Sequence, residues 1–241
     1  MKDKNVGTKK PLLGVIGGMG AQATSRFYDK LHSMQTVASE QDYIDVLIYS
    51  ITSTPDRTAF ILEQSPESPL GSLVHAARTL ENASVSLLAM PCVTSHFFYK
   101  ELTDTVSVPI VNLPVETANF VVSQRQQSVG ILATDGTLKS RILQDTLEKQ
   151  NIKTIIPSDD MQSKLMNVIY AVKQGATPST DVISEISLDL CKIGADTTIL
   201  ACTELSTLGK IPNTIDVLDV LVCHILKELD ALPTVHDLPG K

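Results

Sequence analysis

The chain has 241 residues, of which 43% are hydrophobic and 20% charged, and its net charge is −7 at neutral pH. This is the composition of a soluble globular protein with room for one large or two small domains. The acidic balance gives no basic face for nucleic acid or for a membrane surface, and no stretch approaches the about 20 apolar residues of a membrane helix.

Cysteine usage and the start of the chain both indicate a reducing compartment. The first ten residues are polar and precede no signal-peptide core, so we expect a cytoplasmic protein. None of the four cysteines, Cys92, Cys191, Cys202 and Cys223, forms a C-x-x-C pair, and a disulfide framework is not expected. Catalysis and core packing remain as their possible roles.

The first half of the chain alternates short apolar runs with helical patterns. The runs at 11–16, 45–51, 85–90 and 108–113 predict strands, and the patterns at 23–31, 69–81, 94–102 and 115–123 predict helices. The first strand ends in Gly17-Gly-Met-Gly20, where glycines let backbone N–H groups approach a carboxylate or phosphate. Neither G-x-G-x-x-G nor G-K-S/T follows, so nucleotide binding is only weakly indicated.

The pattern starts again after a polar break at 124–127. We expect strands at 128–133, 153–157, 196–201 and 214–218, a small-residue turn at 134–137, and helices at 138–150, 161–174, 178–193 and 219–229. The second half echoes the first in its strand, small-residue turn and helix order. The sequence therefore predicts an α/β protein of two related halves, each with a mainly parallel sheet flanked by helices.

Two strands close on a cysteine that is followed within two residues by threonine. These are Cys92 with Thr94 and Cys202 with Thr203. Ligands of open α/β sheets bind at the carboxyl ends of strands, and a following helix N-terminus would favour the thiolate. Two thiols on opposite sides of one carbon could remove a proton from one face and return one to the other, which inverts a stereocentre. Such a reaction requires no cofactor in principle.

Several short blocks match a known family. The chain resembles the aspartate/glutamate racemase superfamily, specifically its cofactor-independent aspartate racemase branch, from about residue 12 to 229. The matching blocks are Gly14–Gly20 with Ala23 and Thr24, Pro55–Thr58, Met90–Cys92 with Thr94 and His96, Glu116–Ala118, Thr134 with Gly136 and Thr137, Lys173 with Gly175, and Ala201–Glu204.

This resemblance implies a domain division and a place for the site. The first α/β domain would comprise 11–115 plus 212–230 and the second 116–211, with the active site in the cleft between them. Residues 1–10 and 231–241 are expected to be flexible tails. The resemblance also implies a homodimer, a small amino-acid substrate, and neither a cofactor such as pyridoxal phosphate nor a metal.

The resemblance also assigns roles to eight residues. Cys92 and Cys202 would be the two acid/base thiols, and Arg57 and Lys173 would contact the side-chain carboxylate of aspartate, with glutamate the next choice. The residues lining the α-carboxylate and amino end would be Met19, Thr94, Thr137 and Thr203. From the pattern alone, Arg57 is read first as a solvated loop residue, and Lys173 could equally be a partner of a helix dipole.

Two positions depart from the family pattern. Val93 stands where an asparagine usually follows the first cysteine, which removes an amide that could bond the substrate, and Ala21 replaces a proline that the glycine turn should not need. Three alternatives follow: a racemase of broad specificity, a related lyase or isomerase that uses one cysteine, and a catalytically silent amino-acid-binding protein.

Other cysteines and histidines have structural interpretations. Cys191 and Cys223 lie in apolar helical patterns and are expected to pack. His96, four residues after Cys92, is expected to stabilise a helix or orient the thiol rather than bind a metal. Glu204 could orient Cys202 or cap the next turn, and the sequence does not separate these roles. It also leaves open which thiol serves which enantiomer.

Overall fold

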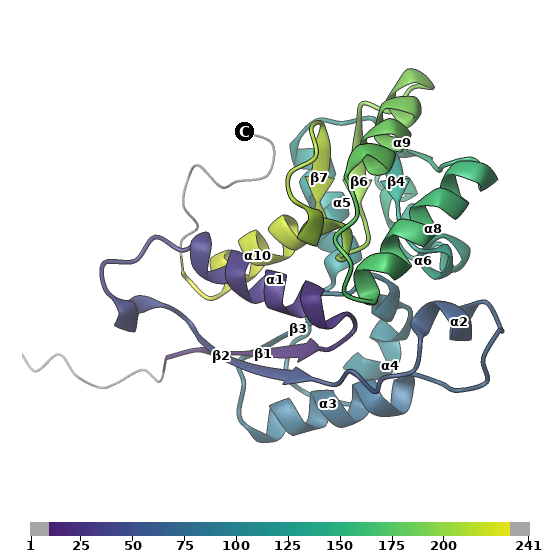
Figure 1. The fold of residues 1–241 in the computed structure, drawn as a ribbon. Helices are drawn as coiled ribbons and strands as arrows, with labels where there is room; N and C mark the ends of the chain where they lie inside the picture. The colour runs from purple at the N-terminus through teal and green to yellow at the C-terminus, as the bar shows by residue number, and fades with distance from the viewer. Residues whose placement is uncertain (1–9, 232–241) are drawn as a thin grey trace, which may run out of the picture.

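The computed structural model describes residues 10–231, which form two parallel β-sheets with helices packed against them (Figure 1). The predicted tails lie outside the described residues, apart from residues 10 and 231. Within the described part, no helix has the length and apolar character needed to cross a bilayer.

The first sheet is three-stranded and has the order β2-β1-β3. Its strands are β1 (Leu12–Gly17), β2 (Asp45–Ser50) and β3 (Leu87–Ala89). β1 is the central strand of this sheet, and its residues from Leu13 to Gly17 are buried, as expected for a strand covered on both faces. The helical segments of this half are α1 (Ala21–Ser33), η1 (Glu40–Asp42), α2 (Arg57–Ile61), α3 (Leu70–Asn82), η2 (Thr94–Phe98), α4 (Tyr99–Thr103) and α5 (Leu113–Ser123).

The second sheet is four-stranded and has the order β5-β4-β6-β7. Its strands are β4 (Ser128–Leu132), β5 (Lys153–Ile155), β6 (Thr197–Leu200) and β7 (Thr214–Asp216). The helical segments are α6 (Asp135–Ser140), α7 (Gln144–Glu148), α8 (Asp159–Lys173), α9 (Asp181–Lys192), η3 (Leu205–Leu208) and α10 (Val217–Glu228). The predicted fold class, two parallel sheets flanked by helices, is confirmed.

The C-terminal segment belongs to both halves. The predicted division placed 212–230 with the first domain, but β7 pairs with β6 in the second sheet. α10 then crosses to pack against α1 and α5 (Figure 1). The predicted boundary is therefore wrong for the strand, whose Ile215 side chain is buried beside Ile199 of β6.

Three local expectations also differ from the structure. The predicted strand 108–113 is reduced to a bridge between Ile110 and Leu88, because Pro109 has no N–H to donate and α5 begins at Leu113. The predicted helix 138–150 is interrupted at Arg141, which has a left-handed backbone with φ of 56°. The predicted turn at 134–137 is instead the start of α6.

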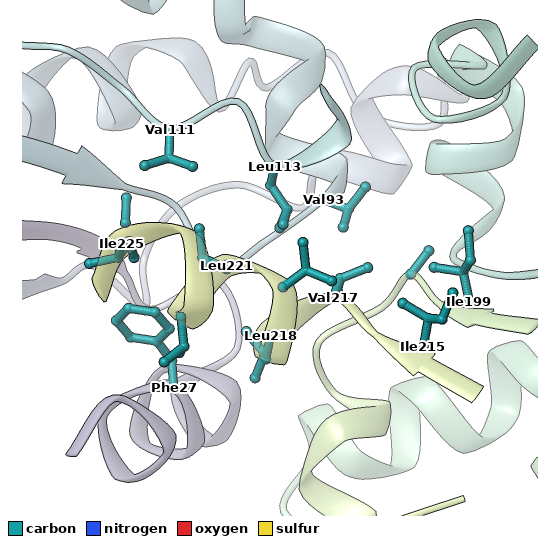
Figure 2. Packing of buried hydrophobic residues seen from close by; sticks show 14 of the residues in the cluster. Phe27, Val93, Val111, Leu113, Ile199, Ile215, Val217, Leu218, Leu221 and Ile225 are labelled. Carbon is teal, nitrogen blue, oxygen red and sulfur yellow. The ribbon is translucent and has the colours of Figure 1, made fainter. Parts of the chain in front are cut away.

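One apolar cluster joins the two sheets. It contains Val15 of β1 together with Val129 of β4, and both side chains are fully buried. Figure 2 shows α10 at the centre of this cluster, with Leu221 lying between the first half and the second. The two halves therefore share a core and are not separate globules.

The glycine turn after β1 requires glycine for a steric reason. Gly18 has a φ of 87°, and a Cβ at this position would lie 2.4 Å from the backbone nitrogen of Ile51. The turn is further fixed by the hydroxyl of Thr24, which accepts the Gly18 N–H at 2.9 Å. Only a residue without a side chain fits here.

Gly18→Ala should lower the free energy of unfolding by about 1–3 kcal/mol, because it adds both backbone strain and a clash. Urea unfolding measures this change. Gly71→Ala is the matched control, since nothing lies within 4 Å of a Cβ there and alanine in a helix is worth up to about 1 kcal/mol over glycine. Equal effects of the two substitutions would contradict the steric account of Gly18.

Candidate active site

The turns that carry the two cysteines meet across the two halves. Cys92 follows β3 and Cys202 follows β6, so each lies beyond the carboxyl end of a strand. Their neighbours are in direct contact, because the Thr203 hydroxyl donates to the Pro91 carbonyl at 3.0 Å. Both cysteines are buried and free. The structure thus brings the two predicted thiol segments together at one place.

The surroundings of Cys202 do not favour a thiolate as the sequence pattern suggested. Only the short 3-10 turn η3 follows Cys202, so the helix dipole expected there is small, whereas after Cys92 the turn η2 runs directly into α4. The Cys202 Sγ donates to Glu204 Oε2 at 3.0 Å. Burial and the neighbouring Glu204 carboxylate raise the pKa of Cys202 well above its ordinary value, while Lys173 acts in the opposite direction.

Arg57 is a buried residue at the start of α2, not a solvated loop residue. Its Nη1 donates to the carbonyls of Pro55 at 3.1 Å and Thr54 at 3.4 Å. Its Nε is buried and has no partner within the described part of the chain. A buried guanidinium nitrogen without an acceptor is costly, so this nitrogen is suited to receive a ligand carboxylate.

Lys173, at the end of α8, lies among acidic groups close to Cys202. Burial acts to lower the pKa of Lys173, but Glu204, Cys202 and Asp56 outweigh it, and the pKa is raised. Its Nζ lies 3.7 Å from Asp56 Oδ2. Burial acts to raise the pKa of Asp56, yet the Ala59 N–H and the nearby cations lower it overall. Arg57 and Lys173, predicted to act together, therefore belong to one charged group.

Three threonine hydroxyls form a ring of hydrogen bonds between the halves. Thr94 lies 3.0 Å from Thr134 and 2.9 Å from Thr137, and the latter two are 3.1 Å apart. Thr134 was not among the predicted site residues, although its place as the N-cap of α6 is a recognisable sequence signal. The ring joins the segment after Cys92 to the start of α6.

Met19 is buried in the first half of the molecule, beside the segment that follows Cys92. The Ser95 hydroxyl donates to its sulfur at 3.0 Å. Sequence analysis did not single out Ser95, because a lone serine carries no pattern. Met19 is thus fixed near the cysteine segment, as a lining residue would need to be.

Val93 packs into the shared core. Its side chain is buried in the same apolar cluster as Leu113 and Val217, which Figure 2 shows around it. The departure from the family pattern therefore places an apolar group where an amide would need a polar partner.

His96 links backbone segments around the first cysteine. Its Nδ1 donates to the Cys92 carbonyl at 2.9 Å, and its Nε2 accepts the Leu113 N–H at 3.2 Å. Burial lowers the pKa of His96, which keeps the ring neutral. Among residues 10–231, no group of three or more His, Cys, Asp or Glu side chains could hold a metal ion. The histidine thus fixes the backbone beside Cys92.

The remaining cysteines lie away from this site. Cys191 of α9 is half-buried and accepts a hydrogen bond from Asn213 at 3.4 Å. Cys223 of α10 is half-buried against the shared core. Its neighbour His224 points to Glu116, with 3.0 Å between Nδ1 and Oε2. These positions agree with the packing roles expected for both cysteines.

The fold has two similar α/β halves whose cysteine turns meet. The model of the Asp/Glu/hydantoin racemase family matches residues 16–225, and the chain belongs to this family. It is an amino-acid racemase, and both the family and this class of enzyme were predicted correctly from the sequence motifs.

Three relatives show the extent of the similarity. A broad-specificity amino-acid racemase of Bacillus subtilis is 28% identical over 220 residues, which cover 88% of this chain and 94% of the relative. The structure of an aspartate racemase from Picrophilus torridus is 28% identical with a TM-score of 0.83, covering 94% of this chain and 97% of that one. An aspartate racemase homologue from Pyrococcus horikoshii is 23% identical with a TM-score of 0.73, covering 92% and 100%, and supports the fold alone.

Burial of the neutral His96 ring should make the free energy of unfolding depend on pH. Because its folded-state pKa lies below its ordinary value of 6.5, its contribution to stability is complete above that pH. The contribution is lost as pH falls, by up to about 1.4 kcal/mol per pH unit for one proton. His96→Gln should therefore be less stable near about pH 7.5 but should lose less stability than the parent on going to about pH 5.5.

Urea unfolding at both pH values measures this difference. His75→Gln, at an exposed position of α3, is the matched control and should follow the parent. If His96→Gln lost as much stability between the two pH values as the parent, protonation of His96 would not be the cause of the parent's loss of stability at low pH.

Proposed function

We propose that the protein racemises an acidic amino acid, aspartate first and glutamate next, by a cofactor-independent reaction of two cysteines. The observation that carries the proposal is the meeting of the Cys92 and Cys202 turns from opposite halves, through the bond from Thr203 to Pro91. Acid/base groups approaching one carbon from two sides are what inversion requires.

In this mechanism one cysteine begins as a thiolate and the other as a thiol. The thiolate removes the Cα proton, and the electron pair left behind spreads onto the α-carboxylate. The thiol on the opposite face then gives its proton to Cα, so that the product has the inverted configuration. Hydroxyl donors such as Thr94 and Thr137 would stabilise the charge on the carboxylate.

The substrate class follows from the charged group beside Cys202. Arg57 offers an unpartnered, buried Nε, and Lys173 lies near the same place. A planar guanidinium and an ammonium are suited to a second carboxylate, which aspartate and glutamate carry and neutral amino acids lack. The structural relative from Picrophilus torridus is an aspartate racemase, which supports the same choice.

Broad specificity is the second candidate. Lys173 has Asp56 at 3.7 Å and Glu204 nearby, so acidic groups already offset much of the positive charge. A site with little excess charge discriminates less strongly by side-chain charge. The Bacillus subtilis relative is a broad-specificity racemase. The presence of both cysteines argues against single-thiol lyase chemistry and against a silent binding protein.

A cytoplasmic location, a homodimer and a first domain of 11–115 that is closed by α10 remain parts of the proposal. The location rests on the four free cysteines, the homodimer on the family resemblance, and the domain on the packing of α10 against α1.

Incubation with L-aspartate in D₂O should give D-aspartate with deuterium at Cα, because the returned proton comes from a thiol that exchanges with solvent. Cys92→Ser and Cys202→Ser should each reduce inversion by about 100-fold or more, since a serine hydroxyl is a far weaker acid and base. Chiral chromatography with mass spectrometry follows both quantities.

Cys191→Ser is the matched control, because Cys191 lies in α9 away from the two cysteine turns, and it should leave inversion unchanged. Absence of inversion and exchange across a panel of amino acids would refute racemisation. Full activity of either Cys92→Ser or Cys202→Ser would refute only the two-thiol mechanism.

Arg57→Gln should weaken aspartate binding by about 10–100-fold, because a charge-assisted hydrogen bond is worth about 1.5–3 kcal/mol. Binding of asparagine, which has nearly the same shape without the charge, should change little. Calorimetry on both ligands measures the difference, with Arg78→Gln on the exposed surface of α3 as the control. Equal losses for the two ligands would assign Arg57 to the fold and not to the side-chain carboxylate.

A further inference from the structure

Glu204 is a buried carboxylate to which the proposed mechanism gives no role. It is 4% exposed, and its Oε2 accepts the Cys202 thiol at 3.0 Å. Its other oxygen, Oε1, is buried without a hydrogen-bond partner in the described part of the chain. Oε1 lies against the glycine turn of the first half, where a Cβ on Gly20 would come within 2.7 Å of it.

The Glu204 carboxylate raises the pKa of the Cys202 thiol, and the neighbouring charged groups do not cancel this effect. Lys173 on α8 is the cation that acts on Cys202, and Asp56 and Arg57, at the start of α2, act in turn on Lys173. No ion pair within 4 Å neutralises Glu204 among residues 10–231. A carboxylate that close to a sulfur favours the thiol, because a thiolate there would place two negative charges together in a poorly solvated place.

Cys92 has different surroundings. Its Sγ makes no hydrogen bond within residues 10–231, and its carbonyl, not its sulfur, receives the His96 proton. His96, whose pKa is lowered, and the apolar Val93 are its neighbours, and among residues 10–231 no carboxylate is hydrogen-bonded to its sulfur. The two sulfurs therefore occupy unlike surroundings, although the two halves of the fold are alike.

We propose that Glu204 is a positioning residue that keeps Cys202 in the thiol form in the free protein, so that Cys92 is the thiolate that begins the reaction. This inference rests on the proposed function. Cys92 takes the Cα proton and Cys202 gives its own proton to the other face. After product leaves, Cys92 loses its proton to water and Cys202 regains one from water, so no net proton is consumed.

The protonation state of Cys202 can be measured without turnover. In Glu204→Gln the negative charge is gone and the shape is kept, so the Cys202 thiolate should form at lower pH. Its rate of alkylation by iodoacetamide near about pH 7.5, followed by peptide mass spectrometry, should rise by about tenfold for each unit by which the pKa falls. Alkylation of Cys92 in the same sample should stay the same.

Two controls separate charge from shape. Glu204→Asp keeps the charge, so its Cys202 alkylation should stay nearer to the parent than to Glu204→Gln. Glu185→Gln on the exposed surface of α9 removes a carboxylate elsewhere and should change neither cysteine. If Cys202 alkylation in a folded Glu204→Gln protein matched the parent at every pH, Glu204 would not set the state of this thiol.

The pH profile of kcat/KM gives a readout that a purely structural role would not move. Because Cys202 must hold its proton to act as the acid, the basic limb of the profile should shift to lower pH in Glu204→Gln, while the acid limb stays. A uniform loss without a shifted limb would overturn the proposal. Failure of racemisation itself would appear as inactivity of the parent, whatever the alkylation shows.

Discussion

The structure depends on the apolar core that the two halves share. α10 leaves the second sheet at β7 and packs against α1 of the first half, and the Lys30 ammonium, which pairs with Asp216 at 3.2 Å and with Asp219, links the same elements. Because this core joins both sheets, their carboxyl ends have a fixed relation to one another. The bond between Thr203 and Pro91 forms only if that relation is kept. Packing far from the two cysteine turns thus positions them relative to one another.

Close contact between the halves then strengthens the interactions between charged groups at their boundary. Gly136 of α6 lies so near α2 that a Cβ would come within 2.8 Å of the Thr58 Cα, and Gly20 is equally close to Glu204. Such contacts leave little space for water, and charges interact more strongly where water is excluded. This explains why Glu204 and Lys173 both act on Cys202 and why Arg57 acts on Lys173. The glycines act by permitting close approach, beyond any role in anion binding.

Sequence patterns revealed most of the fold and the outline of the site. Buried parallel strands are continuous apolar runs, so β1, β4 and β6 were recognisable, and a cysteine at the end of such a run is a local signal. What failed were long-range choices, such as β7 joining the second sheet, and local backbone choices, such as the left-handed Arg141. Side-chain direction was also hidden. The contact between Glu204 and Cys202 needs coordinates, because two residues apart in a turn can point together or apart.

The unlike surroundings of the two thiols are compatible with racemisation for a thermodynamic reason. Enantiomers have equal free energies in solution, so the ratio of kcat/KM in the two directions is fixed at one whatever the protein does. A carboxylate beside Cys202 and none bonded to Cys92 can therefore change which of the two cysteines is protonated in the free protein. It cannot change the equilibrium ratio of the two enantiomers. In the proposed mechanism two similar halves let the thiols approach Cα from both sides, and identical electrostatics are not required. The fold can thus repeat its backbone plan while its charges differ.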